Sequence, residues 1–70
     1  MEIEAVTPSQ TKINGITMCN GVLKAALYVY ENLGLDGERF FKYMDGLYGY
    51  DINAEEDITE LKTILEYVKL

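Results

Sequence analysis

Residues 7–17 read TPSQTKINGIT and carry two turn signals inside one short β-rich segment. Pro8 stands where a type I turn favours proline, and Asn14–Gly15 is a strong two-residue hairpin signal because both residue types accept a positive φ. If both turns are used, the chain forms a three-stranded meander. If only the Pro8 turn is used, it forms one hairpin over about residues 2–18, with Gly15 as a bulge in the second strand. We expect the single hairpin.

Three amphipathic segments follow the β-rich segment. Apolar residues at helical spacing predict a helix over about residues 21–33, with Asn20 as its N-cap. Asp36 would cap a second helix over about residues 37–48. An acidic first turn and a long apolar stripe predict a third helix over about residues 54–69. Its expected start is a capping box, formed either by Asn53 with Glu56 or by Asp57 with Glu60.

The expected fold class is therefore α+β, with an N-terminal antiparallel hairpin followed by three helices packed as a small helical core. A chain of 70 residues is one domain, and we treat residues 1–70 as a unit. The helix over residues 21–33 is apolar on two stripes, so it is expected to be central or to be covered in a homodimer. The predicted core is apolar throughout and comprises Ile3, Ile16, Val22, Leu27, Val29, Leu33, Phe40, Met44, Ile58, Leu61, Leu65 and Val68.

Charge and composition argue against several functions. Six Lys and Arg stand against twelve Asp and Glu, a net charge of −6, whereas direct nucleic-acid binding requires clustered cations. The chain has no His, one Ser and one Cys, which removes most groups used in nucleophilic and general-base catalysis. We expect no enzyme activity, no cofactor and no membrane contact, a cytoplasmic location, and a buried Cys19 that acts as a small hydrophobe.

One segment resembles a calcium loop in part. Asp51, Asn53 and Glu55 place oxygen ligands at alternating positions. The same count puts Glu56 where the loop requires glycine and Lys62 where it requires a bidentate glutamate. We therefore expect no metal site and interpret this segment as an acidic helix N-terminus.

Negative charge is concentrated in residues 45–60, which we call the acidic segment. It holds six acids and no Lys or Arg, while the rest of the chain has no net charge. Acids spaced along a rigid element can face a basic groove as DNA phosphates do, and tyrosines are common at protein interfaces. The predicted partner-binding residues are the acids and neighbouring tyrosines, namely Tyr43, Asp45, Tyr48, Tyr50, Asp51, Glu55, Glu56, Asp57 and Glu60.

In size, acidity and tyrosine content the chain resembles the small inhibitor proteins that phages encode against host nucleases and defence complexes. The resemblance implies nucleic-acid mimicry and a protein partner with a basic surface, and it assigns no role to any single residue. Two other interpretations stay open at this point. The acids can be an ordinary solvated surface with the tyrosine rings in the core, or the chain can be an assembly module that associates through the apolar face of its first helix.

Overall fold

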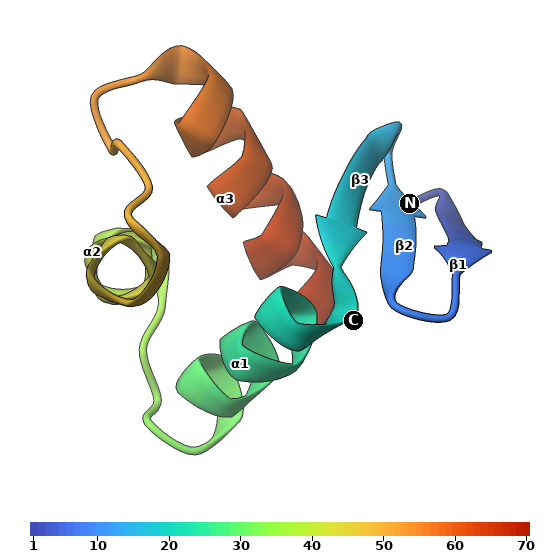
Figure 1. The fold of residues 1–70 in the computed structure, drawn as a ribbon. Coiled ribbons are helices and arrows are strands. Elements are labelled where there is room, and N and C mark those ends of the chain that lie inside the picture. Colours follow the sequence, from blue (N-terminus) through green and yellow to red (C-terminus); the bar gives the residue numbers. More distant parts are fainter.

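The computed structural model describes residues 1–70 and contains one sheet and three helices. The elements are β1 (Ile3–Thr7), β2 (Gln10–Ile13), β3 (Ile16–Cys19), α1 (Asn20–Glu31), α2 (Gly37–Tyr48) and α3 (Glu55–Val68). The strands form an antiparallel sheet in the order β1–β2–β3, and α3 lies between this sheet and α2 (Figure 1). The fold is α+β, as the sequence predicted.

Both turns are used, so the expectation of a single hairpin is wrong. Asn14 and Gly15 adopt φ values of 50° and 83° between β2 and β3, which makes Gly15 a turn residue rather than a bulge. The residues Ile13 and Met18 explain this choice, because both are buried. They stand an odd number of positions apart, so a continuous strand would direct them to opposite faces. The chain reversal places both on the face that meets the helices.

The helices begin and end close to the predicted positions. The range of α2 is as predicted, and Gly49 ends it in the left-handed conformation at φ 73°. Helix α1 ends at Glu31, and Cys19 rather than Asn20 is its N-cap residue. Neither capping box forms at α3, whose N-cap residue Ala54 has no side-chain cap.

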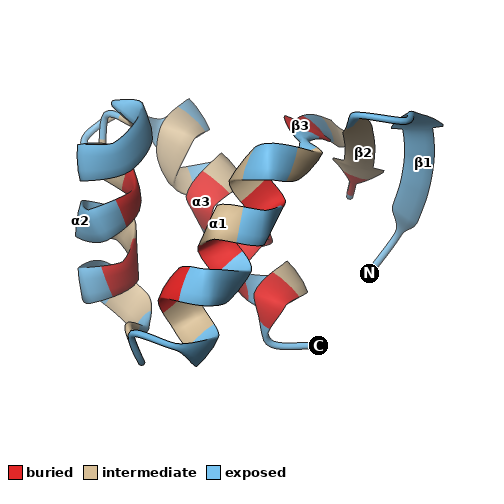
Figure 2. Ribbon diagram, turned by 60° about the horizontal axis from the view of Figure 1, so that its bottom comes forward, coloured by how far each residue is buried: buried red, intermediate tan, exposed pale blue.

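The core lies where the three helices and one face of the sheet meet (Figure 2). Of the predicted core, Ile16, Val22 and Ile58 are only partly buried, and Ile3, Leu27 and Leu33 are exposed. Ile3 is exposed because β1 is the outer strand, and Leu33 is exposed because it follows the end of α1. The buried hydrophobic residues are Ile13, Met18, Leu23, Ala26, Val29, Phe40, Met44, Leu61, Ile64, Leu65 and Val68.

Cys19 is exposed, so the expectation of a buried thiol is also wrong. Side chains alternate between the two faces of a strand, and the inward position on β3 belongs to Met18. Cys19 therefore follows on the outward side, where α1 begins. The alternation along the strand outweighs the general tendency of cysteine to be buried.

An ion pair joins the end of α3 to the start of α2. The ammonium of Lys69 lies 2.9 Å from the carboxylate of Asp36 and 5.9 Å from the centre of the Tyr30 ring. The hydrogen bond from Lys69, together with one from the Gly37 N–H, lowers the pKa of Asp36. Asp36 is the N-cap residue of α2, as predicted. None of the three helices combines the length and the apolar character that crossing a bilayer requires.

Candidate partner-binding site

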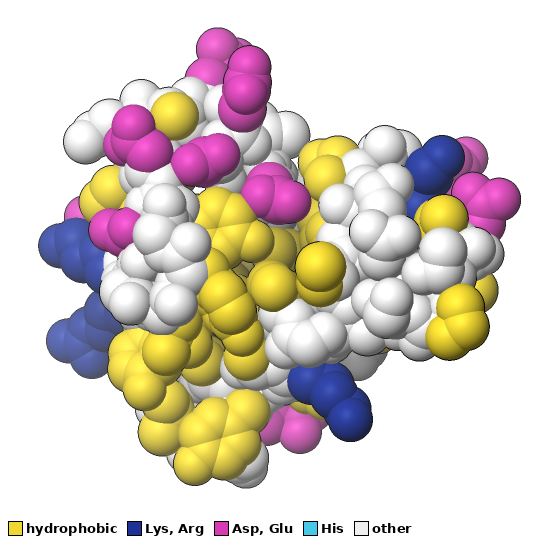
Figure 3. Space-filling view, viewed as in Figure 1, with side chains coloured by type: hydrophobic (Ala, Val, Ile, Leu, Met, Phe, Trp, Pro, Cys, Tyr) yellow, Lys and Arg dark blue, Asp and Glu magenta, His cyan; other side chains and the backbone are white.

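Acidic side chains gather at the end of the molecule where α3 begins, and a hydrophobic surface lies directly beside them (Figure 3). The first two turns of α3 line a hollow of about 540 Å³, which we call the acidic hollow. Its lining contributes four carboxylates and one apolar side chain from the sheet. The lining residues are Ile16, Glu55, Glu56, Asp57, Thr59 and Glu60. Sequence reasoning did not place Ile16 here, because nothing local links β3 to the start of α3.

The acids of the acidic segment have no cationic partner within the chain. The two ion pairs of the protein join Lys42 to Glu38 and Lys69 to Asp36, and both lie outside residues 45–60. Glu55 and Glu56 are exposed at the first turn of α3. Acids at this position are favoured by the partial positive charge of a helix N-terminus, so they also stabilise α3. The negative charges of Glu55 and Glu56 are not neutralised by a side chain of this protein, and they face the solvent.

Asp51 and Asp57 hold the loop that leads into α3. The backbone N–H of Asp51 donates to the Asp57 carboxylate at 2.7 Å. The carboxylate of Asp51 in turn accepts from the backbone N–H of Asn53 at 2.9 Å. Asp51 and Asp57, both predicted to bind the partner, therefore also stabilise the loop. Each uses one carboxylate oxygen for this and leaves the second free to accept a hydrogen bond from a partner protein.

Tyr50 and Glu60 form a partly buried pair beside this loop. Burial raises the pKa of Tyr50 to about 12, with further contributions from the negative charges of Glu60 and Asp57. Burial also raises the pKa of Glu60, and the charge of Asp57 acts in the same direction. The site thus holds its acids close enough to repel one another, and a cation that approached them would relieve this repulsion.

The structure brings Tyr50 near Glu60 and Asp57 and brings Tyr48 near Tyr50, while Tyr43 points away from Tyr48 around α2. The side chains of Tyr48 and Tyr50 are close enough to interact electrostatically. Tyr43 stands five positions before Tyr48 on α2. At about 100° per residue the two side chains point about 140° apart around the helix. Both are exposed, and Asp45 on the same helix is half-buried.

Titration of the tyrosines gives a first expected result. Tyr50 is expected to ionise near pH 12 in the folded protein. The folded pKa lies above the ordinary tyrosine value of 10.0, so the stability that this group contributes is present below pH 10 and is lost as the pH rises through about 12. Ultraviolet absorbance of the phenolate would measure this. The late step should vanish in Tyr50→Phe and persist in Tyr48→Phe.

Neutralising Glu60 is expected to stabilise the protein at neutral pH. Because its folded pKa is raised, Glu60 contributes stability only while it is protonated, and that contribution is lost as the pH rises through the folded value. Glu60→Gln should therefore raise the urea midpoint at pH 7. The advantage should shrink as the pH falls through the folded pKa of Glu60 and should be gone below pH 4.5, the ordinary pKa of a glutamate. Glu56→Gln, at an exposed position, is the control. An equal rise in the urea midpoint of both variants would contradict the idea that partial burial makes the charge of Glu60 destabilising.

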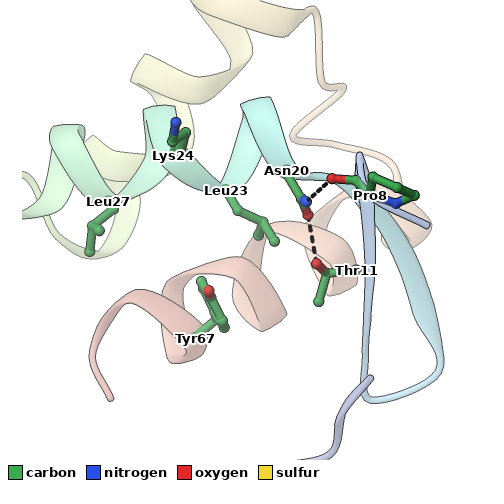
Figure 4. A pocket seen from close by; sticks show the side chains of 7 residues that line it. All are labelled: Pro8, Thr11, Asn20, Leu23, Lys24, Leu27 and Tyr67. Carbon is green, nitrogen blue, oxygen red and sulfur yellow. Dashed lines mark hydrogen bonds between the residues drawn. The ribbon is translucent and has the colours of Figure 1, made fainter. Parts of the chain in front are cut away.

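A second hollow, of about 420 Å³, lies between the β1–β2 turn, α1 and the end of α3 (Figure 4). The side-chain amide of Asn20 spans one side of it. Its oxygen accepts from the Thr11 hydroxyl at 2.6 Å, and its nitrogen donates to the Pro8 carbonyl at 3.2 Å. Asn20 therefore fastens the first turn of α1 to the sheet instead of capping the helix. No group of three or more acidic or cysteine side chains is arranged to hold a metal ion.

Comparison of the chain with protein-family models, with curated proteins and with solved structures finds no match.

Proposed function

We propose that this chain binds a protein with a basic surface and covers the region of that surface where nucleic acid binds. The observation that carries the proposal is the acidic hollow, with two exposed glutamates, Glu55 and Glu56, and no cation of the chain paired with it. Nucleic-acid-binding surfaces are rich in Lys and Arg that neutralise phosphates. Carboxylates on a rigid helix offer these Lys and Arg side chains negative charge, as phosphates do, and they are held in place more firmly than the phosphates of a flexible nucleic-acid backbone.

The surroundings of the acidic hollow support a protein partner. Ile16 gives the hollow an apolar wall, and the exposed ring of Tyr48 offers a large rigid contact with a polar tip. An interface needs such contacts, since charge alone mainly raises the association rate. The proposed partner is a nuclease or defence complex in the cytoplasm, of the kind against which phages encode small acidic inhibitors. The role is inhibition or regulation by occlusion, without catalysis.

Charge reversal at the hollow tests the proposal. The protein and its E55K/E56K variant would be used as baits in host lysate at about 0.1 M and about 1 M salt, where the Debye length falls from about 10 Å to about 3 Å. We expect a nucleic-acid-binding protein that is retained at low salt, released at high salt and lost with E55K/E56K. Nucleic acid that the partner binds should compete with the bait.

The matched control is E31K/E66K, which changes the net charge equally at two exposed glutamates outside the acidic segment. It should retain the partner. If both variants lose the partner equally, net charge rather than the acidic hollow governs binding. If E55K/E56K retains the partner, the proposed site is wrong.

One observation favours a second candidate function, an assembly module that associates through apolar contacts. Helix α1 leaves Leu27 and Tyr28 exposed, and Leu33 is exposed just beyond its end. An interface made by these residues would hold or strengthen at high salt, in contrast to one made by the acidic hollow. Retention of the same partner, or of a second copy of the chain, at about 1 M salt would favour this alternative.

A further inference from the structure

The outer edge of β1 is free along its whole length. All five residues of β1 are exposed, and the strand pairs only with β2. Figure 2 shows β1 at the margin of the molecule, away from the buried faces of the helices. A free edge presents unpaired N–H and C=O groups that can pair with another strand. This edge is separate from the acidic segment and plays no part in the proposed function above.

The register identifies which peptide groups point outward. The N–H of Asn14 donates to the carbonyl of Glu2 at 2.9 Å, so these two residues form a hydrogen-bonded pair across β1 and β2. Ile3 lies opposite Ile13, and Ala5 lies opposite Thr11. Because hydrogen-bonded and non-bonded pairs alternate in an antiparallel ladder, the N–H and C=O groups of Ile3 and the N–H group of Ala5 face away from β2. The register of β1 on β2 shifts between Ala5 and Thr7, so this regular alternation ends at Ala5. The regular part of the edge therefore offers two donors, the N–H groups of Ile3 and Ala5, and one acceptor, the carbonyl of Ile3.

Side-chain charges define what can pair with this edge. Glu2 and Glu4 lie on one face of β1, and a hollow of about 340 Å³ beside the strand is lined by both of them. Lys12, opposite Glu4 on β2, offsets one of the two charges. Ile3 and Ala5 lie on the other face, where Ile3 is 49% exposed. An incoming strand would thus meet acids on one face and apolar surface on the other.

A second copy of the chain does not suit this edge. An antiparallel pair that used the outward groups of the regular part of the edge would place Ile3 of one copy opposite Ala5 of the other. Glu4 would then lie directly opposite Glu4 of the other copy, and like charges in that position are destabilising. A strand with Lys or Arg at the corresponding positions would instead place its cations beside Glu2 and Glu4.

We propose that β1 is a docking edge for an extended segment of another protein in which basic and apolar residues alternate. The segment adds a fourth strand to the sheet through the peptide groups of Ile3 and Ala5. Its basic side chains lie beside Glu2 and Glu4, and its apolar side chains lie beside Ile3. Main-chain pairing supplies the attachment, and the alternation of the side chains supplies the selectivity.

A capped peptide in which lysine alternates with valine is a direct probe, with a glutamate–valine peptide as its counterpart. The measurement is amide hydrogen exchange by NMR, made in the E55K/E56K protein so that attraction to the acidic segment does not contribute. With saturating lysine peptide we expect exchange at Ile3 and Ala5 to slow at least about tenfold, while Glu4, already paired with β2, changes little. The glutamate peptide should bind at least about tenfold more weakly.

Two variants complete the test. E2K/E4K should reverse the preference between the two peptides. Ala5→Pro removes one outward donor without removing a bond to β2, and it should abolish protection at Ile3. Protection that appears on other residues and not on Ile3 and Ala5 would overturn the docking edge. Protection at Ile3 and Ala5 that rises with protein concentration alone would show that the occupant is a second copy, which also overturns the proposal. Neither result bears on the acidic hollow.

Discussion

Replacing Phe40 with alanine is expected to lower the free energy of unfolding by about 3–5 kcal/mol. Phe40 is completely buried and is among the largest side chains in the core, and it packs edge-on against Phe41 with ring centres 6.2 Å apart. A domain of this length has a total stability of about 4–10 kcal/mol. The variant should therefore lose a large part of its stability, which urea unfolding followed by circular dichroism would measure.

Leu47→Ala is the matched control for this substitution. Leu47 lies on the same helix and is 50% exposed, so its truncation removes less buried area and should cost under about 1 kcal/mol. If Phe40→Ala lowered the free energy of unfolding no more than Leu47→Ala does, the placement of Phe40 in the core would be wrong.

Replacing Asp57 with alanine is expected to cost about 1–2 kcal/mol, more than any other single change at the acidic hollow. The substitution removes the acceptor for the Asp51 N–H, a bond of 2.7 Å, and leaves the loop before α3 without its link to the helix. It also removes an acid from the first turn of α3. Thermal and urea unfolding would measure the loss.

Asp57→Asn separates the two contributions of Asp57. Its amide oxygen can still accept from the Asp51 N–H, so most of the stability should remain. The pKa of Tyr50 should nevertheless fall below about 12, because the charge of Asp57 is one of its causes. Equal destabilisation by Asn and Ala would contradict the hydrogen bond as the main contribution.

Local sequence signals predicted the helices well and the sheet only in part. The acidic first turn of α3 and the Asp36 cap of α2 act within a few residues, so their effects can be recognised from the sequence. The choice between one hairpin and two could not be recognised in this way. Each turn signal is valid by itself, and the outcome depends on Ile13 and Met18 reaching the same core from different strands.

In the candidate site, too, some features follow from local sequence signals and others depend on how distant parts of the chain pack together. That Glu55 and Glu56 would be exposed on the polar side of a helix follows from the spacing of the apolar residues. The bond from Asp51 to Asp57 spans a loop and the start of a helix, and its geometry follows from no periodic pattern. The wall formed by Ile16 depends on how the sheet packs against α3.

The meander also bears on how fast the molecule folds. Each strand pairs with the next one along the chain, across a loop of two residues at both Pro8–Ser9 and Asn14–Gly15. Closing such short loops costs little chain entropy, and isolated hairpins form in about 1–10 μs. The strand pairings are therefore local contacts that can form early, whereas the contact between α1 and α3 must close a much longer loop and costs more chain entropy.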